Sequence, residues 1–214
     1  MIEFIGRAAG TVLLAIALAA FSGHDSRAKT ITDSAGRTVE VPDQIAHVLA
    51  AGPPAAVILY TLAPDKLIGW TRELNAQEAE FVAPTYRGLP VVGRITGKEG
   101  KLTPDVVVAL HPDAIIDVGT INSEYVELAD RFQKQTGIPY VLIDGMLASS
   151  AETYRTLGAI LGAAPRAEEL AHYADATLKD VADQVAAVPQ GARPRVYYGR
   201  GADGLETGTT GSIN

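Results

Sequence analysis

The chain has 214 residues, of which 47% are hydrophobic, and its formal net charge at pH 7 is -7. An acidic chain without a basic block is a poor partner for nucleic acid or anionic lipid. Cysteine does not occur, so we expect no disulfide, no thiolate metal site and no lipid anchor on an N-terminal cysteine.

The N-terminal segment has the layout of a secretory signal peptide. An apolar run covers residues 8–21, and the sequence Ser-Arg-Ala at 26–28 places small residues at the two positions that a signal peptidase reads. The run is too short to cross about 30 Å of hydrocarbon comfortably. We therefore predict a cleavable signal peptide over residues 1–28 and a protein that is free in the periplasm. An uncleaved signal anchor is the alternative.

The next part of the chain alternates short apolar runs with helical patterns. Residues 33–37 should turn a β-hairpin, with Gly36 at positive φ. Buried strands are predicted at 47–51, 67–70, 90–93, 114–118 and 140–143. Helices are predicted at 55–62, 76–81, 104–110, 123–135 and 151–161. This alternation indicates parallel βαβ crossovers, and therefore an α/β lobe with a parallel sheet and flanking helices.

A long helix should follow this lobe. Pro165 stands at its favoured first turn, and one apolar stripe then continues at Leu170, Ala174, Leu178, Val181, Val185 and Val188. At 1.5 Å per residue the helix is roughly 35 Å long, which is enough to bridge two lobes. Without a second lobe, part of the stripe would be exposed and would reduce solubility.

Residues 195–198 should begin a new strand, which a Gly-rich segment follows. A single strand cannot bury itself, so the end of the chain reads as the start of a truncated second lobe. The predicted divisions are a signal peptide at 1–28, an α/β lobe at 29–148, linking helices at 149–189 and the start of the second lobe at 190–214.

Five short motifs occur in an order that resembles a known family. They are residues 31–42, Val48-Leu-Ala-Ala-Gly-Pro-Pro54, Pro64-Asp-Lys-Leu-Ile-Gly-Trp70, residues 89–93 and His111-Pro-Asp-Ala-Ile-Ile116. The mature chain resembles the periplasmic substrate-binding proteins of ABC importers for ferric siderophores, haem and cobalamin. The resemblance implies two α/β lobes joined by a rigid helix, with a metal chelate held between them and handed to a permease. It implies a monomeric receptor that is not an enzyme and has no cofactor of its own.

Ligands of open parallel sheets bind outside the carboxyl ends of the strands. Trp70 can offer a flat face to a macrocycle or catecholate, while Arg72 and Arg94 can donate to anionic oxygens. The predicted ligand-binding residues are Pro53, Trp70, Arg72, Arg94, Thr120, Met146, Tyr198 and Arg200. Taken alone, each of these residue types is more often found in packing or on the surface than in a ligand site.

Two exposed acidic residues are candidates for the contact with the permease. Members of the resembled family use an exposed glutamate on each lobe to meet arginines of the permease, and either Glu78 or Glu80 would serve here. The alternative is an ordinary solvated helix face.

Several other interpretations remain open. The spacing G-x-G-x-x-G at 199–204 suggests a dinucleotide site in an exported enzyme, but the β-prone residues 205–214 do not favour the required helix. The histidines at 24, 47, 111 and 172 are scattered, which disfavours a bare transition-metal site. Within the receptor class, the ligand can instead be a corrinoid, haem or an oxyanion. The chain can also be a nonfunctional fragment of such a receptor.

Overall fold

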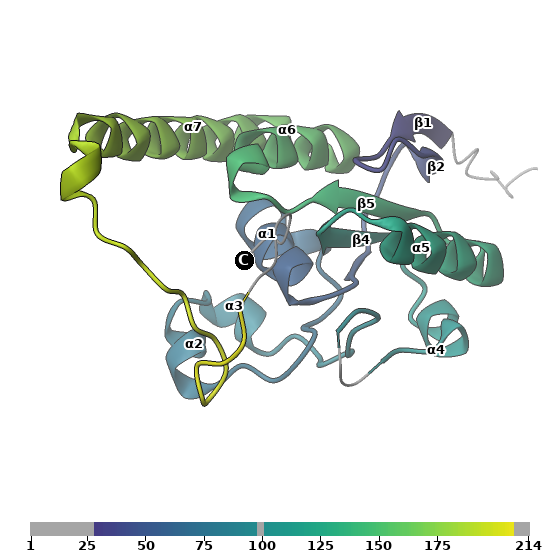
Figure 1. Ribbon diagram of the computed structural model, residues 1–214. Coiled ribbons are helices and arrows are strands. Elements are labelled where there is room, and N and C mark those ends of the chain that lie inside the picture. The colour runs from purple at the N-terminus through teal and green to yellow at the C-terminus, as the bar shows by residue number, and fades with distance from the viewer. Residues whose placement is uncertain (1–27, 98–100, 208–214) are drawn as a thin grey trace, which may run out of the picture.

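A three-stranded parallel sheet forms the centre of the molecule (Figure 1). The computed structural model describes residues 28–97 and 101–207, so most of the predicted signal peptide lies outside the described residues. The strands are β3 (Val48–Ala50), β4 (Ala114–Gly119) and β5 (Tyr140–Asp144), in the order β3-β4-β5. The predicted α/β fold with a parallel sheet, flanking helices and a long helix is confirmed.

Helices cover both faces of the sheet, which explains why its strands are continuous apolar runs. Alternate strand residues point to opposite faces, as Ile115 and Ile116 do. On one face lie α1 (Pro53–Leu62), α6 (Ser150–Leu161) and α7 (Ala164–Ala187). On the other face lie α4 (Pro104–Ala109) and α5 (Ser123–Thr136). The short helices α2 (Ala76–Glu80) and α3 (Pro84–Arg87) complete the lobe, and α3 was not predicted.

The predicted hairpin is confirmed by antiparallel strands β1 (Ala28–Thr32) and β2 (Thr38–Pro42). Gly36 has a φ of 76°, as the turn requires. The buried Asp33 fixes the turn, because its Oδ1 accepts hydrogen bonds from the amides of Ala35 (3.0 Å) and Arg37 (2.9 Å). Its Oδ2 accepts from the amide of Leu142 (3.2 Å), so the same carboxylate attaches the hairpin to β5.

The predictions of strands at 67–70 and 90–93 are wrong, because these residues do not form regular strands. They form only single parallel bridges, Val48↔Leu67 and Trp70↔Val91. Each run is four residues long, and Pro90 has no amide hydrogen to extend a ladder. The bridges nevertheless place Leu67 beside β3, at the edge of the sheet, and Trp70 beside Val91.

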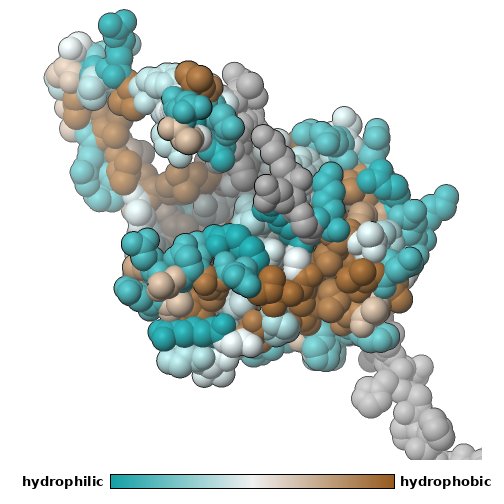
Figure 2. Space-filling view, turned by 90° about the horizontal axis from the view of Figure 1, so that it is seen from below, coloured by the Kyte–Doolittle hydropathy of each residue, from teal (hydrophilic) through white to brown (hydrophobic). Residues whose placement is uncertain are grey.

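The long helix α7 is only partly covered. Ala167 and Ala171 pack closely at its start, but Val181, Val185 and Val188 are 53%, 48% and 38% exposed. Figure 1 shows α7 projecting past the end of α6. The expectation of one buried stripe is therefore wrong for its second half, whereas the expected partial exposure is confirmed. Figure 2 shows further apolar residues exposed on the underside of the molecule.

The strand predicted at 195–198 is also wrong. These residues are irregular and exposed, and the only pairing in this part of the described chain is a single antiparallel bridge between Arg200 and Glu206. No strand among the described residues lies beside them to complete a ladder. No helix in the described ranges combines the length and apolarity needed to cross a membrane.

A buried acid lies within the core of the sheet. Asp117 on the central strand accepts a hydrogen bond of 3.0 Å from the hydroxyl of Tyr140 on β5. Burial raises the pKa of Asp117 to about 6, although the Tyr140 hydrogen bond acts in the opposite direction. The folded state therefore holds this proton more tightly than the unfolded state.

Replacing Asp117 with asparagine should stabilise the protein at neutral pH. The wild-type protein should lose stability as pH rises from about 4 to 6, because ionising Asp117 is costly only in the folded state. Asp117→Asn removes this cost, so its free energy of unfolding at pH 8 should exceed the wild-type value by up to about 3 kcal/mol. Urea denaturation at pH 4.5 and pH 8 checks this. An equal difference at both pH values would contradict it.

Gly158 allows α6 and α7 to pack closely. A Cβ atom at this position would lie 2.2 Å from the Cβ of Ala167, so we expect Gly158→Ala to push the helices apart. The cost in unfolding free energy should be about 1–3 kcal/mol. Gly88→Ala is the matched control, since nothing lies within 4 Å of its added Cβ. Comparable losses in the two variants would show that close packing at Gly158 is unimportant.

Candidate functional site

The carboxyl edge of the sheet places several loop residues on one side of the molecule. The strands are parallel, so Pro53 after β3, Thr120 after β4 and Met146 after β5 all lie beyond the same edge. The structure divides the predicted ligand-binding residues among separate hollows and segments.

The first hollow lies between α1 and the segment from Trp70 to Val82. We call this cavity of about 340 Å³ the Trp70 hollow. It brings together four predicted residues, namely Pro53, Trp70, Arg72 and Glu78. The remaining lining residues are Ala56, Val57, Tyr60, Thr61, Thr71, Leu74, Phe81 and Val82.

Trp70 forms a fixed wall of this hollow. Its side chain is only 6% exposed, and its indole Nε1 donates a hydrogen bond of 2.9 Å to the carbonyl of Tyr86. Its ring lies 5.5 Å from that of Tyr60, which in turn makes an edge contact with Tyr86. These contacts hold three aromatic rings together, and they leave Trp70 as part of an apolar wall.

Arg72 and Glu78 form a bidentate ion pair at the rim. The guanidinium nitrogens lie 2.8 and 2.5 Å from the two carboxylate oxygens. Glu78 Oε2 also accepts from the amide of Asn75 (3.0 Å), whose side chain accepts from the amide of Glu78 (2.9 Å) and caps α2. The hydrogen bonds from Arg72 hold the pKa of Glu78 at about 2. Two residues predicted for different roles therefore neutralise each other.

Glu80 differs from Glu78. It is exposed on α2 and makes no ion pair or hydrogen bond with another side chain in the described part of the protein. Its carboxylate is available to a partner, whereas that of Glu78 is already engaged.

A second hollow of about 340 Å³ contains Thr120 and Met146, together with Ser34, Ile121 and Asp144. The carboxylate of Asp144 shapes this loop, because it accepts from the amide of Met146 (2.9 Å) and from the hydroxyl of Ser149 (2.7 Å). Thr120 and Met146 are thus brought together, but they do not line the Trp70 hollow.

The other three predicted residues lie elsewhere. Arg94 is half-buried, with its guanidinium beside Gly97. Tyr198 and Arg200 are exposed on the segment after α7, where Tyr197 donates a hydrogen bond to the carbonyl of Gly204 (3.1 Å). The ligand-binding role of these residues remains a prediction.

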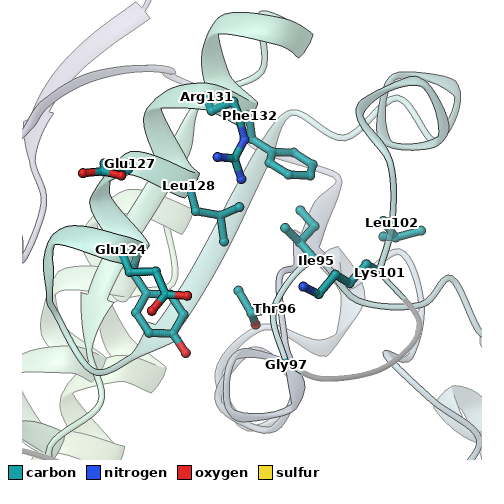
Figure 3. A pocket seen from close by; sticks show the side chains of 11 residues that line it. Ile95, Thr96, Gly97, Lys101, Leu102, Glu124, Glu127, Leu128, Arg131 and Phe132 are labelled. Atoms are coloured by element: carbon teal, nitrogen blue, oxygen red, sulfur yellow. The ribbon is translucent and has the colours of Figure 1, made fainter.

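A groove of about 540 Å³ lies between α5 and residues 95–97 and 101–102 (Figure 3). Lys101 and Glu124 point into it from opposite walls, and Arg131 extends over Leu128. Phe132 contributes to its apolar floor. The groove was not predicted, because the spacing of charged residues on an exposed helix does not indicate which other segment packs beside them.

Sequence reasoning also missed the contribution of α1 to the Trp70 hollow. Val57 and Tyr60 line it, although they belong to a helix and not to a strand end. A signal was present, because the helix is apolar on all sides and therefore needs a second covered face. In the described ranges, no cluster of histidine and carboxylate side chains is arranged to hold a metal ion.

Solved structures that are similar to this chain include transport receptors. An ABC transporter solute-binding protein from Sulfurospirillum deleyianum superimposes with a TM-score of 0.72 at 25% identity, covering 86% of this chain and 58% of that protein. The TroA-like periplasmic binding protein FepB from Veillonella parvula gives 0.57 at 26% identity, covering 75% and 50%. A molybdate-binding periplasmic protein of Haemophilus influenzae gives 0.63 at 18% identity, covering 80% and 58%.

These likenesses show the fold. The chain has the fold of the periplasmic solute-binding proteins of ABC transporters. It spans between half and three-fifths of the length of the proteins compared. No family model matches the sequence, and no curated protein matches it either.

The Arg72–Glu78 pair can be tested by titration. The Glu78 carboxyl should titrate near pH 2 in the wild-type protein, because its ionised form accepts hydrogen bonds from Arg72. Arg72→Gln should raise the pKa of Glu78 toward the ordinary value of about 4.3. Carboxyl-carbon NMR measures both midpoints. An unchanged midpoint in the variant would show that the pair does not form in solution.

Proposed function

We propose that this protein is a periplasmic receptor that captures an iron chelate of the siderophore type and delivers it to an ABC permease. The observation that carries the proposal is the Trp70 hollow, which lies beside the carboxyl edge of the sheet. The fold that contains this sheet is that of solute-binding proteins. Ligands of open α/β sheets bind at this edge. The function is binding and delivery without a chemical reaction.

The lining of the hollow favours a chelate over a bare ion. Phe81 and Val57, which are 84% and 60% exposed, offer apolar surface to an organic ligand. A bare transition-metal ion needs several converging nitrogen or oxygen ligands, and the described residues offer no such cluster. In a chelate, by contrast, the organic molecule itself supplies the metal ligands.

Haem, a corrinoid and an oxyanion are the alternative ligands within the class. Solved neighbours include a heme binding protein and a molybdate-binding protein, both at 18% identity, so these likenesses concern the fold. The apolar walls favour a ligand with an extended organic surface over an oxyanion, which needs several hydrogen-bond donors. A nonfunctional fragment would bind none of them.

For the permease contact we propose Glu80. An exposed carboxylate without a partner among the described side chains can pair with an arginine of another protein, whereas Glu78 would first have to leave Arg72. Charge reversal by Glu80→Lys should therefore reduce transport without reducing binding of the chelate.

The only tryptophan of the chain lines the hollow, so its fluorescence reports on the site. A ferric siderophore should quench Trp70 emission saturably, because its absorbing iron centre would lie close to the indole. Val57→Asp should weaken binding about tenfold or more, since a charge replaces an exposed apolar wall residue. The matched control is Val181→Asp, an exposed valine on α7 outside the hollow, which should leave affinity unchanged.

Calorimetry supplies the second readout. Ferric siderophores, haem, a corrinoid and molybdate are titrated into the 214-residue chain under the same conditions. Saturable binding of a ferric siderophore alone supports the proposal, whereas selective binding of another ligand identifies an alternative. Absence of binding by all four would overturn the receptor function for this chain.

A further inference from the structure

We propose that Glu78 is a specificity-determining residue of the Trp70 hollow. By occupying the guanidinium of Arg72, it makes the hollow select an uncharged, flat apolar group and reject an anionic one. This inference rests on the proposed function only in assuming that the hollow receives part of a ligand. It reverses the expectation that Arg72 donates to anionic oxygens of that ligand.

The first support is the geometry of the ion pair. Both oxygens of Glu78 are engaged by the two terminal nitrogens of Arg72, at 2.8 and 2.5 Å. A carboxylate or phosphate ligand would bind arginine through the same fork of donors. Glu78 therefore already occupies the position that an anionic ligand group would take.

The second support is that α2 holds Glu78 from the opposite side. Its Oε2 accepts from the amide of Asn75 at 3.0 Å, and its own amide donates to Asn75 Oδ1 at 2.9 Å. The carboxylate that pairs with Arg72 is therefore also a member of this capping box. An incoming anion must therefore displace a carboxylate that is fixed at two points.

The rest of the lining contributes no further charge. Val57, Leu74 and Phe81 are apolar, and Thr61 and Thr71 carry only hydroxyl groups. One positive and one negative side chain leave the hollow electrically neutral. A flat apolar group gains contact with the aromatic walls, whereas an anion meets repulsion from Glu78.

The expected effect is moderate because the pair is open to solvent. The Arg72 side chain is 54% exposed, so water and salt screen its charge. We expect the discrimination to be about two- to fivefold in affinity and to weaken as ionic strength rises.

Two dyes that differ by one sulfonate test the inference. N-phenyl-1-naphthylamine is uncharged, and 8-anilinonaphthalene-1-sulfonate carries the same rings with an anionic group. Binding is measured by energy transfer from Trp70, which is the only tryptophan of the chain and lines the hollow. Leu178→Asp removes apolar surface from the groove between α6 and α7, so a signal that persists in this variant does not come from there.

The wild-type protein should bind the uncharged dye more tightly. Glu78→Gln should raise the affinity for the sulfonate about two- to fivefold, because Arg72 loses its resident carboxylate. The affinity for the uncharged dye should change less than twofold. Glu40→Gln makes the same charge change on the exposed face of β2 and should alter neither affinity.

A second variant keeps the inference testable if Glu78→Gln does not fold. Arg72→Gln leaves Glu78 unpaired and should weaken sulfonate binding further while retaining the uncharged dye. The inference is overturned if Glu78→Gln changes both dyes equally or neither dye, or if no dye binds near Trp70. If Glu78→Gln affects only the sulfonate dye but no chelate binds, the proposed function is overturned and this inference is not.

Discussion

The parallel pairing of β3, β4 and β5 determines where the loops that follow these strands lie. β4 is hydrogen-bonded on both sides, with register Val48↔Ala114 toward β3 and Ile115↔Tyr140 toward β5. Helices cover both faces, so slipping by one residue would move a whole set of buried side chains to the wrong face. With the register fixed, the three strands end at one edge, and their loops lie together there.

At this edge, the candidate site contains one arginine, Arg72, whose charge is already compensated by Glu78. α1 follows β3 directly, which places Pro53 and Tyr60 opposite Trp70. The capping box at Asn75 then fixes Glu78 where it can meet Arg72. The backbone hydrogen bonding of a five-residue helix thus controls the charge of the hollow. A solute-binding protein built in this way would recognise its ligand mainly through apolar contact.

Local patterns in the sequence predicted most of the fold. The alternation of apolar runs and helical segments located β3, β4, β5 and the long helix, and the turn at Gly36 located the hairpin. Predictions failed where structure depends on distant neighbours. Residues 67–70 and 90–93 carry strand propensity but form single bridges, and residues 195–198 have no strand beside them among the described residues. Likewise, spacing along the chain does not reveal that Arg72 reaches Glu78, because that contact depends on the path of the intervening loop.

The proposed function places an iron chelate beside Trp70 at the carboxyl edge of the sheet. Diffraction at the iron absorption edge, from crystals of the chain grown with a ferric siderophore, locates the iron atom itself. We expect an anomalous peak over the Trp70 hollow, with the organic part of the chelate against Trp70 and the Arg72–Glu78 pair retained. A peak in the groove beside α5, or no ordered iron at saturating chelate, would contradict it.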